Sequence, residues 1–313
     1  MFRQLSHLAV LSAFLAAFGC EQPASFQLET PDPRLVVVSN FTRDKAVQVF
    51  VSRSQFILDE QKKEPVLDAV VEIYEDGEHL ETLELVDART DSNAVPYYTT
   101  RSLVPKVNTT YTIEVEASCC APVMAKSRIP NPIGFSSAGI YDFSLEENPE
   151  TDELLASYWV SLSFEDPSEE KNYYHISILQ QVYEYAFVEG DTVITSSYHR
   201  SLVFNPEENE NGRVAHIDGG LLLEDNMLNN GEMIHLDVPL TIRLDKNREL
   251  LGKLFLELRA VTEEYYRYFS GLSQQNQSSG SPFKEPVIIY DNIEGGLGVF
   301  AGYNASLDSL YVQ

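Results

Sequence analysis

Histidines and carboxylates are the side chains of this sequence with the most catalytic potential, and neither group has the spacing of a catalytic site. The six histidines form no HExxH pattern and no cluster with metal-ligand spacing: His7, His79, His175, His199, His216 and His235. A GxSxG elbow, a P-loop and a dinucleotide fingerprint are also absent from the sequence. Carboxylates are so numerous that some pair will stand at glycosidase distance by chance. We therefore predict that the protein is not an enzyme.

A hydrolase is the alternative, and it would need a pocket that gathers His175 or His235 with two carboxylates. Both histidines lie in strand-like runs, as does His199, and we interpret all three as ordinary sheet residues.

Glycine-rich and acidic turns offer fragments of ligand-binding chemistry. The run Gly295-Gly296-Leu297-Gly298 has an acidic lead-in and is followed by a strand-like run, so anion binding at a helix start is not expected. We predict that these glycines turn the backbone beside a packed sheet. Asp218-Gly219-Gly220 and Asp225-Asn226 carry oxygen ligands but form no complete calcium loop. We therefore expect no cofactor and no metal, with a bound calcium ion as the alternative.

The charge of the chain limits its partners. Its 313 residues contain 22 Lys and Arg against 48 Asp and Glu, a formal net charge of -26. Such a chain repels phosphate backbones and anionic lipid headgroups at long range, so we exclude nucleic acid as a partner. Solubility is the simplest interpretation of the acidity, and a calcium-binding surface is the alternative. Hydrophobic residues make up 43%, which is enough to build a core.

Cys20 is the residue with the clearest chemistry. It follows an apolar run over residues 8–18, which is too short to span a bilayer but suits the core of a signal peptide. Ala17-Phe18-Gly19-Cys20 is typical of a bacterial lipobox, in which the cysteine thiol accepts diacylglycerol. Buried acyl chains such as palmitate then hold the protein to a membrane. An ordinary secretory signal that happens to end near a cysteine is the alternative.

Cys119 and Cys120 are the other two cysteines, and they are neighbours. Neighbouring cysteines can form only a strained vicinal disulfide, and they lack metal-ligand spacing. We expect them to be half-buried strand residues that point to opposite faces of a sheet.

Short alternating runs indicate strands throughout the chain. In the first part they cover 35–38, 47–52, 69–74, 80–85 and 111–117, with an Asp-Gly turn at 76–77 that predicts a hairpin. Longer runs follow at 156–164, 173–188, 234–244 and 254–261. We divide the chain into a lipoprotein signal peptide (1–19), a tether (20–33), a small β-sandwich (34–132) and a C-terminal β-domain (133–313). The predicted fold is all-β, an immunoglobulin- or prealbumin-like β-sandwich followed by a larger antiparallel β-domain with one short helix.

The predicted helix starts after Thr262, whose side chain is a suitable cap, and Glu263 and Glu264 favour its first turn. Tyr265, Phe269 and Leu272 then fall on one face at helical spacing. We expect the polar run 275–281 to end the helix as a loop.

Three motifs resemble a known family. Phe164-Glu165-Asp166-Pro167 leads into Asn172-Tyr173-Tyr174, an acidic turn occupies 222–231, and a closing run extends from Phe283 to Ser306. Together with Cys20 they resemble a Bacteroidota outer-membrane lipoprotein family, the domain of unknown function 4249, over essentially the whole mature chain. Tyr290-Asp291 departs from the family pattern, in which a small residue precedes Asn292. The matching residues are Phe164, Asp166, Pro167, Asn172, Tyr173, Pro286, Asn292, Gly295, Gly296, Gly298 and Phe300.

The resemblance implies a lipid-anchored protein of the outer membrane, exposed at the cell surface, without assigned catalytic residues. Such proteins are often encoded beside TonB-dependent outer-membrane transporters of the SusC type. We therefore expect a non-catalytic binding or accessory subunit whose partners are a TonB-dependent barrel and, through the lipid anchor, the membrane. The alternative is a free-standing surface protein that binds a glycan or a peptide. Its candidate stacking rings are the paired tyrosines Tyr97-Tyr98, Tyr173-Tyr174 and Tyr265-Tyr266.

The same resemblance implies O-glycosylation, because Bacteroidota glycosylate Asp-Ser/Thr followed by an apolar residue. Asp191-Thr192-Val193 and Asp308-Ser309-Leu310 match this pattern, which makes Thr192 and Ser309 candidate acceptors. The pattern is short enough to occur by chance.

Overall fold

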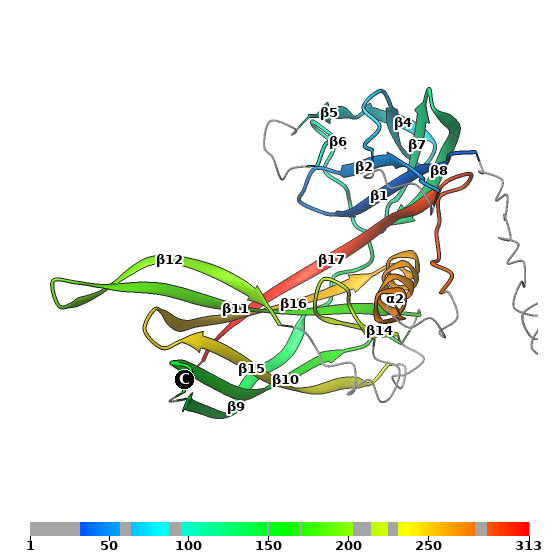
Figure 1. The fold of residues 1–313 in the computed structure, drawn as a ribbon. Coiled ribbons are helices and arrows are strands. Elements are labelled where there is room, and N and C mark those ends of the chain that lie inside the picture. Colours follow the sequence, from blue (N-terminus) through cyan, green and yellow to red (C-terminus); the bar gives the residue numbers. More distant parts are fainter. Residues whose placement is uncertain are drawn as a thin grey trace, which may run out of the picture. The chain divides into compact units, whose positions relative to one another are not determined.

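A computed structural model of the chain describes residues 32–56, 64–87, 95–148, 150–168, 171–202, 214–224, 231–278 and 287–312. Cys20 and Pro286 lie outside these residues. From Pro33 onward the described residues form one compact unit. They consist of strands and a single helix, which confirms the all-β fold class with one helix (Figure 1).

The first part of the unit is a sandwich of two sheet layers. One layer contains β1 (Leu35–Thr42), β2 (Gln48–Arg53), β6 (Tyr97–Thr99) and β5 (Glu84–Val86). The other has the order β4 (Glu78–Thr82), β3 (Val70–Glu75), β7 (Thr110–Ala117) and β8 (Cys120–Arg128). Alternate residues of both layers point inward, and Val37, Val49, Ile73 and Ile113 are fully buried in one core. The Asp-Gly hairpin between β3 and β4 forms as predicted.

Strand β17 (Leu297–Tyr311) links this sandwich to the rest of the chain. It pairs in parallel with β1, from Val36 opposite Leu297 to Thr42 opposite Tyr303, and antiparallel with β16 (Glu249–Val261) (Figure 1). Its Phe300 enters the sandwich core, where the ring stacks on Phe41 with centroids 4.5 Å apart. A division of the chain at residue 132 stays a prediction, but this sheet contains strands from both sides of it.

The second part also packs one sheet on another. β9 (Phe135–Asn148), β10 (Glu153–Glu165) and β15 (Met233–Asp245) form a three-stranded sheet in the order β15-β10-β9. Facing it are β16, β11 (Tyr173–Val188) and β14 (Leu221–Glu224), with β12 (Asp191–Ser201) and β13 (Val214–Ala215) at the edges. Leu162, Ile178 and Leu256 are fully buried in the core between them.

Helix α2 (Glu263–Ser278) packs on the second part where the sequence predicts it. Tyr265 and Phe269 are buried against Val299 and Ala301 of β17. Two details of the prediction are wrong. The helix continues to Ser278, because glutamine is a fair helix former and the run before Ser278 contains neither Gly nor Pro. The Thr262 hydroxyl is buried without a hydrogen-bond partner in the described part of the chain, so it does not cap the helix.

Within the described ranges, no helix combines the length and the apolar character needed to cross a bilayer.

The prediction that Cys119 and Cys120 are both half-buried strand residues pointing to opposite faces of a sheet is wrong for Cys119. Ala117 pairs with Cys120, so Ser118 and Cys119 form the tight turn between β7 and β8. Cys119 is exposed, Cys120 is half-buried, and both are free thiols with their sulfur atoms 2.6 Å apart.

Candidate functional site

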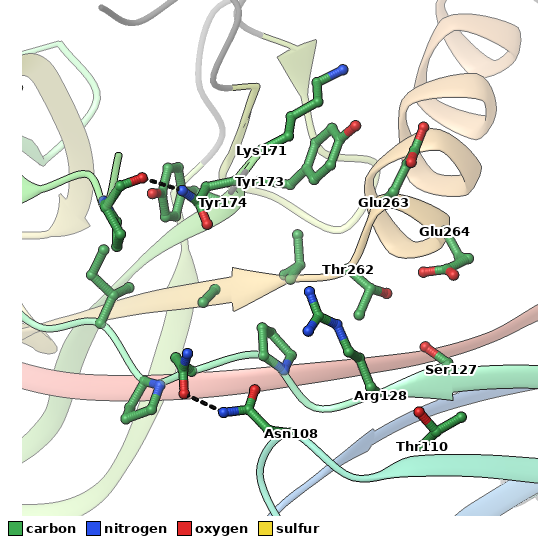
Figure 2. A pocket seen from close by; sticks show the side chains of 18 of the residues that line it. Asn108, Thr110, Ser127, Arg128, Lys171, Tyr173, Tyr174, Thr262, Glu263 and Glu264 are labelled. Atoms are coloured by element: carbon green, nitrogen blue, oxygen red, sulfur yellow. Dashed lines mark hydrogen bonds between the residues drawn. The ribbon is translucent and has the colours of Figure 1, made fainter. Parts of the chain in front are cut away.

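A pocket of about 490 Å³ lies where α2 begins. It is bordered by the ends of β7 and β8, by the residues that precede β11, and by the first turn of the helix. Figure 2 shows Arg128 of β8 extending toward the end of β16 and the start of α2, with Lys171 and Tyr173 across the pocket. The pocket therefore combines groups from both parts of the chain.

Opposite charges line this pocket. The Lys171 ammonium is 2.6 Å from a Glu224 carboxylate oxygen and lies over the Tyr173 ring, 5.1 Å from its centroid. Lys126 and Arg128 add cationic groups, and Glu263 and Glu264 add carboxylates at the helix start. Such a pocket can hold a small polar ligand that carries both charges, with hydroxyl and amide groups for further hydrogen bonds.

The titration of Lys171 limits the chemistry of the pocket. The hydrogen bond with Glu224 raises the pKa of Lys171 above its usual value, so the ammonium stays protonated at neutral pH and is not a nucleophile. Among the described residues, no histidine or cysteine lines the pocket. This set of side chains is suited to binding a polar ligand.

The family motif over residues 164–174 lies beside the pocket and holds the ends of several strands together. Asp166 is almost fully buried, and its carboxylate accepts a hydrogen bond from the Tyr174 hydroxyl and another from the Gly231 amide (3.2 Å). Phe164 packs edge-on against the Tyr174 ring, with centroids 4.9 Å apart. The motif thus joins the end of β10, the start of β11 and the residues before β15.

Two more residues of this motif, Pro167 and Asn172, line the pocket together with Tyr173. The Asn172 side-chain amide donates to the Pro167 carbonyl over 2.7 Å, and Asn172 stands between Lys171 and Tyr173 in the chain. The motif residues therefore shape the pocket rather than present reactive groups to it.

The closing motif fixes β17 against the sandwich. The side chain of Asn292 bridges the turn, because it donates to the Phe300 carbonyl (2.8 Å) and accepts from the Phe300 amide (3.0 Å). Gly295 and Gly298 have positive φ angles of 81° and 109°. A side chain on Gly298 would collide with the backbone of Val37, and Gly296 is enclosed in a similar way. As predicted, the glycines turn the backbone beside a packed sheet, and no helix follows them.

His175 and His216 belong to a buried polar cluster that sequence reasoning missed. His175 lies in β11, as expected, but its ring contacts the Tyr265 hydroxyl at 3.0 Å and the Ser177 hydroxyl at 3.1 Å. Arg259 contacts the same Tyr265 hydroxyl at 3.3 Å. The contacts join residues distant in sequence, so no local spacing signals them.

Whether the protein is an enzyme is not decided by the contacts of His175 and His235, so the absence of catalysis stays a prediction. His175 has hydroxyl and carbonyl partners, and His235 contacts the Ser163 hydroxyl at 2.8 Å. In the described ranges, no three His, Cys, Asp or Glu side chains gather closely enough to hold a metal ion.

The paired tyrosines proposed as sugar-stacking rings are mostly buried, which leaves little ring surface for stacking. Tyr98, Tyr173, Tyr174, Tyr265 and Tyr266 are all buried in the cores, and only Tyr97 is partly exposed. The prediction failed because both members of a pair can be buried where a strand or helix is covered on both faces. Among the described residues, the exposed aromatic rings are those of Phe50, Tyr141, Trp159, Phe187 and Tyr311.

The candidate glycosylation sites differ in accessibility. Thr192 is exposed near the turn between β11 and β12, whereas Ser309 is half-buried in β17 opposite Phe255. Glycosylation at either residue stays a prediction.

The structure defines an all-β protein in which two sheet-built cores share one strand, with a mixed-charge pocket at the start of its helix. The model of the domain of unknown function 4249 matches residues 21–308, so the chain belongs to that family. A comparison with curated proteins finds no match.

Proposed function

We propose that the protein is a non-catalytic binding subunit of the bacterial cell envelope, anchored through Cys20 to the outer membrane and exposed at the cell surface. In this proposal it serves a TonB-dependent, SusC-like outer-membrane transporter. The lipobox and the family resemblance support the location, and the pocket chemistry supports a binding role. The observation that carries the accessory role is the arm, defined here as residues 185–196 of β11 and β12.

The arm extends beyond the strand that supports its base. β16 pairs with β11 only as far as Glu184, whereas β11 and β12 continue to pair up to Val188 opposite Asp191. Figure 1 shows this hairpin extending past the end of β16. Glu189 and Gly190 both have positive φ, which is the geometry of a tight two-residue hairpin turn.

The tip of the arm carries apolar side chains in water. Phe187 is 68% exposed and Ile194 is 49% exposed, and Val188 and Val193 are exposed beside them. A soluble surface rarely gathers several large apolar residues unless a partner covers them. Two apolar strands that project from a folded body are suited to dock on another protein, which supports a barrel partner.

Co-purification from the native cells tests the proposal. A tagged full-length chain is extracted in mild detergent, and its partners are identified by mass spectrometry. The test variant is the double substitution Phe187→Ser with Ile194→Ser. The control is Ile288→Ser with Leu307→Ser, because these apolar residues are even more exposed but lie outside the arm.

The unsubstituted chain and the control should both recover a TonB-dependent barrel, and the arm variant should recover at least about tenfold less, which corresponds to about 1.4 kcal/mol. Circular dichroism of the purified variants checks that the fold is unchanged. Equal recovery by the arm variant, or no barrel with any sample after crosslinking, would overturn the proposal.

A further inference from the structure

The outer face of the β15-β10-β9 sheet carries a pair of exposed aromatic rings. Strand β10 points Tyr158, Val160 and Leu162 into the core, so its alternate residues face outward. Trp159 is one of these outward residues, and it is the only tryptophan in the chain. It is 38% exposed, and Tyr141 of β9 beside it is 41% exposed.

These rings form a continuous apolar row across the sheet. Trp159 pairs with Tyr141 on one side and with Pro239 of β15 on the other. The Tyr141 and Trp159 rings are nearly parallel, with an angle of 18° and centroids 6.1 Å apart. Side chains of paired residues share one face of a sheet, so all three lie on the outer face.

Small polar residues border this aromatic row on both sides. Ser161 of β10 pairs with Gly139 and with Asp237, and the register places these three next to the rings. On the other side, Ser157 and Thr241 have their hydroxyl oxygens 3.2 Å apart. A flat apolar strip flanked by hydroxyls, a carboxylate and a glycine is complementary to a pyranose ring. Such a ring has an apolar face of C–H groups and a rim of hydroxyls.

We propose that this face, defined by Tyr141, Trp159, Ser161 and Asp237, binds a neutral glycan. A pyranose ring stacks on the Trp159 and Tyr141 rings, where the electron-rich ring faces attract the C–H groups. The Asp237 carboxylate accepts hydrogen bonds from sugar hydroxyls, and the Ser161 hydroxyl adds a donor and an acceptor. The site shares no residue with the pocket or with the arm, so it does not depend on the proposed function.

The negative charge of this face and of the chain argues against nucleobases, which also stack on aromatic rings. Nucleobases use similar platforms, but they arrive with a phosphate backbone that binds through cationic grooves. This face presents Asp237, and the chain carries a net charge of -26. An uncharged polyol meets no such repulsion.

The single tryptophan makes the site directly observable. Fluorescence of the full-length chain is titrated with three neutral hexasaccharides, built from β-1,4-glucose, α-1,4-glucose and β-1,4-mannose units. Hexathymidylate and phosphatidylcholine vesicles are titrated in parallel. At least one hexasaccharide should change the Trp159 emission saturably at millimolar concentration, and the two parallel probes should not.

Calorimetry of variants then separates stacking from other effects. Trp159→Ser and Tyr141→Ser should each weaken binding about tenfold, Trp159→Phe should retain most of it, and Tyr311→Ser is the control at another exposed ring. Thermal melts confirm that each variant is folded. The proposal is overturned by no saturable change with any of the three sugars, by a change with vesicles or hexathymidylate alone, or by affinity that Trp159→Ser leaves unaltered.

Discussion

The imidazole rings of His175 and His216 are stacked, with their centroids 4.1 Å apart and their planes 18° from parallel. Both side chains are buried, with 3% and 6% of their surface exposed. Burial lowers the pKa of His216 to about 4, although Asp218 opposes the shift, and Arg259 lowers it further. Burial and the neighbouring His216 hold the pKa of His175 well below its usual value. Both rings are therefore neutral in the folded chain at neutral pH.

Lowering the pH should reduce the stability of the folded chain through this pair of histidines. The pKa of His216 is about 4 in the folded chain and 6.5 without burial, so between these values the unfolded chain binds the proton and the folded chain does not. The free energy of unfolding then falls by about 1.4 kcal/mol for each pH unit as the pH is lowered through this window. Urea unfolding at several pH values measures the slope. His216→Phe should reduce it, the exposed His79→Gln should not, and equal slopes in all three proteins would contradict the prediction.

Gly298 should be intolerant of any side chain. Its φ of 109° is unfavourable for other residues, and a Cβ atom would collide with the Val37 backbone, where β17 pairs with β1. Gly298→Ala should reduce the free energy of unfolding by about 2 kcal/mol or more. Gly134→Ala is the control, because no atom lies within 4 Å of its added Cβ. Chemical denaturation compares the two, and a similar small effect in both would contradict this account of β17.

The Asp166 carboxylate and the Tyr174 hydroxyl should be coupled in stability. Asp166 is buried between Tyr174 and Gly231, so loss of the hydroxyl leaves a charged acceptor partly unsatisfied. A double-mutant cycle of Asp166→Asn and Tyr174→Phe, followed by urea unfolding, should give a coupling energy of about 1–3 kcal/mol. Strict additivity of the two substitutions would show that the motif does not act through this contact.

Local patterns predicted what depends on neighbouring residues. Alternation placed β15 and β10 correctly. The start of α2 followed from Glu263 and Glu264 at helix-favouring positions. These elements are determined mainly by side-chain periodicity, which a single sequence contains.

Long-range pairings could not be predicted in the same way. The parallel pairing of β1 with β17 brings together the two ends of the described unit, and the His175–His216 stack joins β11 to the residue that follows β13. The pocket depends on the same kind of contact, because Arg128 and Lys171 meet there only after folding. No spacing rule relates such residues, so the pocket could be recognised only in the structure. Three of its lining residues, Pro167, Asn172 and Tyr173, were identified from the sequence as part of a family motif.

Photocrosslinking in living cells tests the central claim most directly. A photoreactive phenylalanine analogue replaces Phe187 at the tip of the arm, and a second chain carries it at Leu307, which lies outside the arm and is at least as exposed. The proposed function predicts a crosslinked species from position 187 that contains a TonB-dependent outer-membrane barrel, and much less from position 307. Barrel adducts at neither position, or in equal amounts at both, would contradict it.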